Sequence, residues 1–382
     1  MSATRDALYL RAAALSVLAG REPDWTHLQH CSAHTWQVFF RTERCALGLK
    51  ARLTGAGCAV PERVRAEIER AATRELQRIL SARGQLLRIG RLAAAHAIPA
   101  IVLKGGVAAL TSATPVDVHD VDVLVRPHQA EQLAALLDKE GFHANGPAAT
   151  AHLAQRVSPN VVQIEVHFAL NDVEVTEAMW QRARPLDRAA GLSRLGGADQ
   201  LCHLLVHTVV THPHRRGALR DVLLAAEAVR DCSPAELEEV EHRAARHGLA
   251  RALGDLLTMA RETAAGGPVR DRFRPEAAAN YLLRGPLGWL RFSRFWMSAF
   301  SGALFALLDG GADRRREWGL AWAPPQFPSP WGFAARLERC APRLGRLCRN
   351  AVKVLRLIVC RVVAWPVAVA VRVLAPGPRP AS

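Results

Sequence analysis

Three short segments rich in valine and isoleucine interrupt a chain whose periodicity is otherwise helical. They are IPAIVLKGG from Ile98, HDVDVLVRP from His119 and VVQIEVHF from Val161. Short apolar or alternating runs bounded by glycine, proline or polar residues predict β-strands. Between the second and third segments, an amphipathic helix is predicted to begin at Pro127 and to end at Gly141. We therefore expect an α+β fold, with a small mixed sheet between mostly helical N- and C-terminal regions.

Changes in this pattern divide the 382 residues into four stretches. The first and third show apolar residues at three- and four-residue spacing, which predicts helices. A proline-rich connection and a basic amphipathic tail mark the fourth. The predicted units are an N-terminal helical region, an α/β core, a helical substrate or packing region and a C-terminal helical region, at 1–97, 98–185, 186–275 and 276–382.

Two aspartates stand on one face of the second predicted strand. Residues two apart in a strand project to the same side, so Asp120 and Asp122 point one way while Val121 and Val123 point into the core. Neighbouring carboxylates repel each other unless a cation lies between them. Mg²⁺ suits this arrangement, because it prefers oxygen ligands and shares its coordination shell with phosphates. Two solvated aspartates at a strand end are the alternative interpretation.

The third predicted strand adds a further carboxylate. Gln163, Glu165 and His167 alternate with apolar residues and therefore share one face. Beside two aspartates, Glu165 would complete the carboxylate set of a two-metal site; alone, it would be a charge on an edge strand. His167 would orient Glu165 or contact substrate, or else serve as a buried structural histidine.

A glycine turn follows the first predicted strand. Gly105 and Gly106 allow the backbone to approach a ligand closely and to aim N–H groups at phosphate oxygens. Lys104 would add a compact positive charge. A glycine pair after a strand is, by itself, more often a plain turn.

Taken together, the glycine pair, the Asp-x-Asp pair and the later strand carboxylate resemble the signature of the polymerase-β-like nucleotidyltransferase superfamily. Within it, IPAIVLKGG, HDVDVLV and IEVHF resemble a bacterial family of uncharacterised nucleotidyltransferases, and the likeness extends over residues 5–310. The resemblance implies an enzyme that transfers a nucleoside monophosphate from an NTP, with ATP as the expected nucleotide. The acceptor would be a hydroxyl or similar nucleophile of an unknown molecule, and pyrophosphate would be released.

The resemblance also implies roles for individual residues. Gly105 and Gly106 would form the nucleotide-phosphate turn, with Lys104 beside them. The ligands of Mg²⁺ or Mn²⁺, and the catalytic residues, would be Asp120, Asp122 and Glu165.

One departure from the family pattern bears on activity. Many relatives carry an arginine a few residues before the acidic pair, where this chain has Val116-Asp117-Val118-His119. His119 and Arg126 are the candidates to replace it. A catalytically degenerate nucleotide-binding or scaffold protein is the alternative to an active enzyme.

Three further polar residues are weaker candidates. Asp221 matches a position where the family tends to have aspartate; it would bind the acceptor or orient the glycine turn, or else pair with Arg220 or Arg216. His203 and His207 are four apart on a predicted helix and could share a metal. Without an H-E-x-x-H motif or a third ligand nearby, core histidines are the favoured interpretation.

Composition indicates the compartment and the partners. The net charge of +15 favours anionic partners, although direct nucleic-acid binding is not expected. The eight cysteines form no C-x-x-C pair and the N-terminal apolar stretch is interrupted by Arg11, so a cytoplasmic protein without a signal peptide is expected.

A basic face on the last predicted helix would either be solvated or hold the protein peripherally at the inner face of a membrane. That face comprises Arg346, Arg349, Lys353 and Arg356.

Overall fold

The computed structural model confirms the α+β fold. The described residues are 2–112, 116–146, 148, 151–170, 173–212, 215–246, 250–285, 300–308 without 302 and 306, and 342–375, with the backbone alone for 342–357. The proline-rich connection lies outside these residues. The side chains of the predicted basic face also lie outside them.

A seven-stranded mixed sheet forms the centre of one half of the molecule, in the order β3-β4-β5-β2-β1-β7-β6. Its middle strands β1, β2 and β5 are the three predicted segments; β2 is antiparallel to β1 and parallel to β5. The strands are β1 Ala100–Val102, β2 Asp120–Val125, β3 His143–Asn145, β4 Gln155–Val157, β5 Gln163–His167, β6 Arg184–Pro185 and β7 Leu192–Arg194. β3, β4, β6 and β7 extend the sheet beyond the strands that the sequence indicated.

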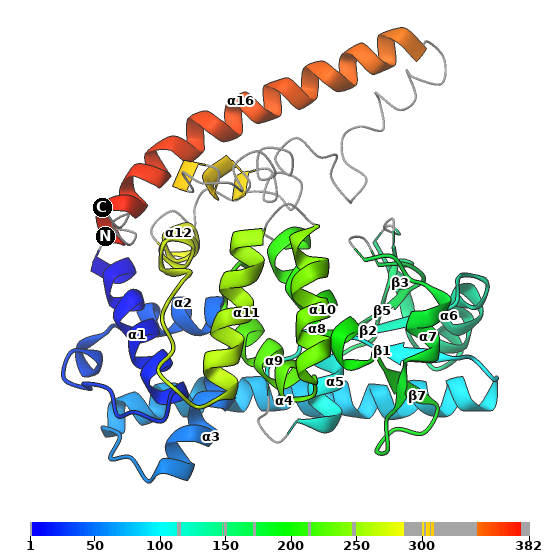
Figure 1. The fold of residues 1–382 in the computed structure, drawn as a ribbon, viewed down its shortest axis with the longest axis horizontal. Helices are drawn as coiled ribbons and strands as arrows, with labels where there is room; N and C mark the ends of the chain where they lie inside the picture. The colour runs from blue at the N-terminus through cyan, green and yellow to red at the C-terminus, as the bar shows by residue number, and fades with distance from the viewer. Residues whose placement is uncertain are drawn as a thin grey trace.

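Three helices belong to the sheet unit, and the long N-terminal helix α4 runs alongside them (Figure 1). They are α5 Lys104–Thr111, α6 Ala130–Lys139 and α7 Glu177–Gln181. A 3₁₀ turn from Pro127 to Gln129 leads into α6, and Gly141 beyond its end has a φ of 86°, as expected for a helix stop. Leu133 and Leu137 of α6 are fully buried.

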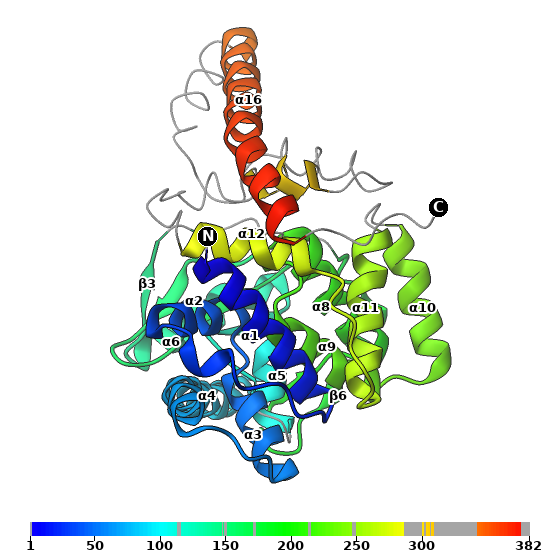
Figure 2. The same cartoon turned by 90° about the vertical axis from the view of Figure 1, so that its left-hand side faces the viewer.

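Helices from both ends of the chain form the other half of the molecule (Figures 1 and 2). The N-terminal helices are α1 Ser2–Leu18, α2 Ala33–Glu43, α3 Ala46–Ala56 and α4 Glu62–Ala95. Those after the sheet are α8 Gly197–Val206, α9 Leu219–Arg230, α10 Pro234–Ala245, α11 Ala250–Ala264, α12 Arg274–Arg284 and α16 Pro342–Leu374. Both views place α2 between α12 and α4, so the two ends of the chain pack together.

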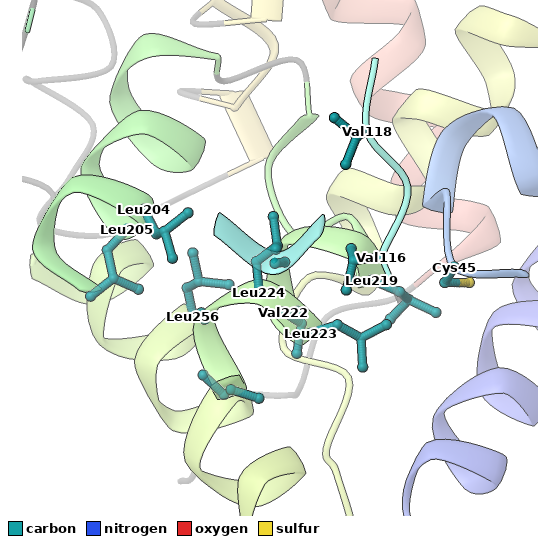
Figure 3. Close-up of a cluster of buried hydrophobic side chains, with 14 of the residues drawn as sticks. Cys45, Val116, Val118, Leu204, Leu205, Leu219, Val222, Leu223, Leu224 and Leu256 are labelled. Atoms are coloured by element: carbon teal, nitrogen blue, oxygen red, sulfur yellow. The ribbon is translucent and has the colours of Figure 1, made fainter. Parts of the chain in front are cut away.

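The segment before β2 is anchored in the hydrophobic core. Figure 3 shows Val116 beside Leu219 of α9, within a cluster that continues through Val222 and Leu224 toward α8 and α11. Val116 and Val118 are almost fully buried. Packing of α9 therefore fixes the approach of the chain to the carboxylates of β2.

The last helix extends away from the rest of the molecule (Figures 1 and 2). Near its C-terminal end, Cys360, Ala364 and Val371 are buried against the body, whereas Val362 and Trp365 are exposed. Among the described residues, no helix is long and apolar enough to cross a membrane.

Candidate active site

The predicted carboxylates meet where β2 and β5 run side by side. The two strands are parallel, and Asp122 lies directly opposite Glu165 in their register, with Leu124 opposite His167. Because side chains alternate along each strand, Asp120 shares a face with Asp122, and Glu165 shares a face with His167. The alternation read from the sequence therefore brings the two strands' polar residues to one face of the sheet.

Asp122 is the centre of this group. It is 2% exposed, and its Oδ1 accepts hydrogen bonds from Lys104 Nζ at 3.0 Å and from His167 Nε2 at 2.9 Å. The same nitrogen of His167 lies 3.5 Å from Oε2 of Glu165. Gln155 of β4 donates to the other carboxylate oxygen of Glu165 at 2.5 Å. Lys104 and His167 therefore both donate hydrogen bonds to a carboxylate that is almost fully buried.

The charges of these groups respond to one another. Burial raises the pKa of Asp122, but the Lys104 ammonium and the His167 hydrogen bond outweigh that effect and hold the pKa well below its usual range. The two carboxylates in turn raise the pKa of His167, although burial opposes this. The pKa of Asp120 is raised by burial and by the negative charge of Asp122. Asp120 is thus the carboxylate whose charge the protein compensates least.

The glycine turn forms the start of α5, directly after β1. Lys104 is the first residue of the helix and has a φ of 50°, a conformation uncommon for a residue with a side chain. A Cβ atom at Gly105 would lie 2.8 Å from Nη2 of Arg220, and one at Gly106 would lie 2.6 Å from a methyl group of Val102. Gly105 therefore makes room for an arginine, and Gly106 lets α5 pack on β1.

That arginine comes from α9 and was not predicted as a site residue. Arg220 donates from Nε to the backbone oxygen of Asp117 at 2.7 Å and from Nη1 to Asp221 at 2.8 Å. Its pKa is raised by Asp221, Asp120 and Asp117, which outweigh the lowering by burial. Arg220 therefore places a guanidinium at the glycine turn, although residues 116–119, directly before β2, contain no arginine. The ion pair with Arg220 is one of the roles that the sequence predicted for Asp221.

The two candidates to replace an upstream arginine are engaged elsewhere. His119 is half exposed and lies 2.7 Å from the carboxylate of Asp117. Arg126 makes a bidentate ion pair with Glu177 at 2.8 and 2.9 Å and stacks over Trp180, at the far end of β2. Neither contacts the carboxylates of the site in the described structure.

His203 of α8 is buried, and His207, the first residue of the π-helical turn that follows α8, is partly buried. Burial lowers the pKa of His203 to about 3 and that of His207 well below its usual value. Their ring centroids are 5.7 Å apart. Within the described residues, neither belongs to a group of three side chains that could hold a metal ion.

A family of uncharacterised nucleotidyltransferases matches residues 40–265, which include the sheet and every residue of the candidate site. The chain belongs to this family. No curated protein matches the chain.

As a nucleotidyltransferase, the chain carries donor groups that fit a divalent cation. Asp122, Glu165 and His167 each offer one ligand atom, and these atoms lie within 4.8 Å of one another. Nδ1 of His167 is buried without a hydrogen-bond partner among the described residues. The uncompensated charge of Asp120 on the same face would also be relieved by a cation. Oxygen donors suit Mg²⁺, and an imidazole donor suits Mn²⁺ better.

Besides Arg220, sequence reasoning missed two contributors to this nucleotidyltransferase site. Gln155 and His152 approach Glu165 from β4 and the segment before it, with His152 Nε2 3.9 Å from the carboxylate. No periodicity marks this part of the chain, because β4 is three residues long and pairs with β5 at a single position. For Arg220, the adjacent Asp221 was the only signal.

Proposed function

We propose that the protein is a divalent-metal-dependent enzyme that transfers a nucleoside monophosphate from an NTP, with ATP the expected nucleotide, to a nucleophile of a second substrate. The observation that carries this proposal is the register of β2 and β5, which sets Asp122 opposite Glu165 in a member of a nucleotidyltransferase family. Three carboxylates on neighbouring strands are the donor set that two-metal phosphoryl chemistry uses.

In this proposal Asp120, Asp122 and Glu165 hold Mg²⁺ or Mn²⁺, and His167 is an additional donor. A bound cation would neutralise phosphate charge and lower the pKa of the attacking hydroxyl. Arg220 and the backbone N–H of Gly105 bind the triphosphate. The N–H of Gly106, which the sequence also assigned to this role, donates to the backbone oxygen of Leu103 at 3.1 Å. The ammonium of Lys104 is paired with Asp122. When a nucleotide binds, this ammonium would move to a phosphate oxygen and would still be paired with an anion.

The reaction then needs one proton acceptor. The acceptor oxygen forms a bond to the α-phosphorus while the bond from that phosphorus to the bridging oxygen breaks. Pyrophosphate leaves with the electron pair, and the hydroxyl proton passes to Glu165. The hydrogen bond from His167 favours the ionised form of Glu165, whose pKa it lowers against the effect of burial.

One observation favours a second candidate, a nucleotide-binding or scaffold protein without catalysis. Lys104 and His167 already neutralise Asp122 within the protein itself. A site that satisfies its own carboxylates has less need of a cation. This candidate predicts nucleotide binding without pyrophosphate release.

The test is pyrophosphate release from each of the four NTPs with Mg²⁺ or Mn²⁺, in the presence and absence of cell extract. We expect Asp120→Asn/Asp122→Asn to lower the wild-type rate by about 10³-fold, because the metal contributes several kcal/mol to the transition state. Asp187→Asn, an exposed carboxylate near β6, is the matched control and should retain full activity. Equal release by wild type and double variant would refute the transferase, and nucleotide binding without release would support the second candidate.

A further inference from the structure

A charged cavity lies on the approach to β2. It has a volume of about 540 Å³ and is bounded by α2, α4, the end of α12 and the segment at Asp117 and His119. Figures 1 and 2 show these helices stacked in the order α12, α2, α4. Such a volume is within the range of small-molecule sites.

Six arginines line this cavity, which we call the arginine pocket. They come from three helices and from the residue that ends α2, and they are Arg41, Arg44, Arg70, Arg74, Arg78 and Arg284.

Only half of these arginines have a carboxylate partner. Asp117, which is fully buried, binds Arg44 at 2.8 Å and Arg78 at 2.7 Å, and Glu67 binds Arg70 at 2.5 Å. The third carboxylate of the pocket, Glu75, accepts instead the backbone N–H groups of residues 46 and 47. Its pKa is raised to about 7 by burial and by Asp117, so it is only about half ionised near neutral pH.

The other three arginines have no carboxylate partner among the described residues. Arg74 donates to a backbone oxygen at 3.3 Å, and Arg284 donates to the backbone oxygen of Arg41 at 2.8 Å. Burial and the neighbouring Arg215 and Arg41 lower the pKa of Arg284 to about 10. Positive charges are therefore gathered here without the negative charge that would balance them.

Two buried donors of the pocket are also unpaired. Nη2 of Arg44 has no hydrogen-bond partner in the described structure, although the residue is 8% exposed. Nε1 of Trp36, which is 3% exposed, has none either. Arg44 has a φ of 53°, so its backbone is held in an uncommon conformation at this position. Buried donors normally have partners, and a bound anion would supply them.

The pocket is connected to the carboxylates through Asp117. Its side chain binds arginines of the pocket, and its backbone oxygen binds Arg220, which lies at the glycine turn. Asp120 is three positions after Asp117 in the chain, a span of at most about 11 Å. A small molecule held in the pocket by one end could therefore present its other end to the carboxylates.

We propose that the arginine pocket binds a phosphate group of the acceptor, so that this enzyme modifies a phosphorylated molecule. The proposal rests on the proposed transferase function, in which the glycine turn and Arg220 hold the phosphates of the NTP. A second anion site then belongs to the second substrate. Guanidinium groups bind phosphate in a bidentate manner.

The first experiment measures the anion site alone, by calorimetric titration of the full chain with inorganic pyrophosphate in EDTA. Without a divalent ion, pyrophosphate can bind at the arginine pocket or at Arg220 and the glycine turn, and substitution of the pocket arginines separates the two sites. We expect Arg41→Gln/Arg74→Gln to weaken binding at least tenfold, since neither residue pairs with a described carboxylate. Arg91→Gln, an exposed arginine of α4 outside the pocket, should leave it unchanged. Wild type that binds no pyrophosphate, or a double variant that binds it equally well, would overturn the site.

Two further measurements identify the source of the phosphate. The affinity for MgATP should be the same in wild type and Arg41→Gln/Arg74→Gln; a parallel loss would assign the pocket to the nucleotide and overturn the acceptor. Cell extract treated with alkaline phosphatase, which is then removed, should no longer support pyrophosphate release by the wild type. Release that survives this treatment would refute a phosphorylated acceptor, whereas release from neither extract would refute the transferase and leave the anion site standing.

Discussion

Arg220 shows how one side chain can supply what the local sequence lacks. The segment before β2 contains no arginine, yet a guanidinium reaches the glycine turn from α9, more than a hundred residues later. Its three nitrogens serve different purposes: two hold Asp117 and Asp221, and the third faces the space that Gly105 leaves free. A lysine at this position could not make all three contacts.

We therefore expect Arg220→Lys to weaken MgATP binding by about tenfold to 100-fold, because a charge-assisted hydrogen bond contributes about 1.5–3 kcal/mol. Titration with MgATP measures the effect, after circular dichroism has established that the variant is folded. Arg243→Lys is the matched control, since Arg243 is a partly buried arginine paired with Asp199 and Glu239 away from the site. Unchanged affinity in Arg220→Lys would remove Arg220 from the nucleotide site.

Glu75 provides a second prediction at the residue scale. Burial and Asp117 raise its folded-state pKa from 4.5 to about 7. The folded protein thus binds a proton that the unfolded chain has already lost between these pH values, and the contribution of Glu75 to stability falls as pH rises through this window. At about 1.4 kcal/mol per pH unit, the loss is on the order of 3 kcal/mol.

Glu75→Gln should remove that pH dependence, because the amide stays neutral. Compared by urea denaturation, the variant should gain about 3 kcal/mol relative to wild type between pH 4.5 and pH 7.5, whatever the constant cost of the substitution. A difference in unfolding free energy that is the same at both pH values would contradict the raised pKa.

At the scale of elements, one buried ion cluster ties together helices from both sides of the family domain. Arg11 of α1 is fully buried and donates to Glu43 at the end of α2 and to Asp271 before α12, each within 2.9 Å. Glu43 also accepts from Tyr281 of α12 and from the first backbone N–H of α9. This cluster positions α2, and with it the residues of the arginine pocket.

Arg11→Ala should therefore destabilise the protein by about 3–5 kcal/mol, the usual effect of leaving buried carboxylates without their partner. Denaturant unfolding of the full chain measures this, with Arg5→Ala on the exposed face of α1 as the control. A loss below about 1 kcal/mol, the range of exposed ion pairs, would show that the cluster is dispensable.

The elements also mark what sequence could and could not predict. β1, β2, β5 and the start of α6 were predictable, because valine-rich alternation, glycines and Pro127 are local signals. β3, β4, β6 and β7 contain two or three residues each, too few for any alternation to appear. Their pairing depends on tertiary contacts, such as the parallel register of β7 with β1.

The same division holds for the candidate site. Asp122, Glu165 and His167 were predictable as neighbours once two strands were assigned, because each lies on the expected face. Arg220 and the arginine pocket were not, since their members are distant in sequence and lie on helices whose charged residues look like ordinary solvated positions. The sequence also predicted Lys104 as a phosphate ligand. In the described structure its ammonium donates a hydrogen bond to Asp122.

At the scale of the whole molecule, the net charge of +15 is unevenly used. The arginine pocket holds part of it, and α16 carries basic residues and no acidic ones along its whole length. The described end of α16 also exposes an apolar stripe at helical spacing, with Val362, Trp365 and Val373 each more than 60% exposed. A helix with positive charge, an exposed tryptophan and an apolar face has the properties of a membrane-surface anchor.

We therefore expect the protein to bind vesicles that contain phosphatidylserine and not vesicles of phosphatidylcholine alone, with binding that weakens as salt rises. Val362→Asp/Trp365→Asp should reduce this binding by at least about tenfold, because one large apolar side chain contributes about 1.5 kcal/mol or more on burial. Val161→Asp, an exposed valine before β5, is the control. Vesicle sedimentation measures the effect, and pyrophosphate release in solution should be equal in both variants and wild type. Since α16 packs on α12 and α12 contributes Arg284 to the arginine pocket, membrane attachment would hold that pocket near the lipid surface. Undiminished binding by Val362→Asp/Trp365→Asp would show that the stripe is not the anchor.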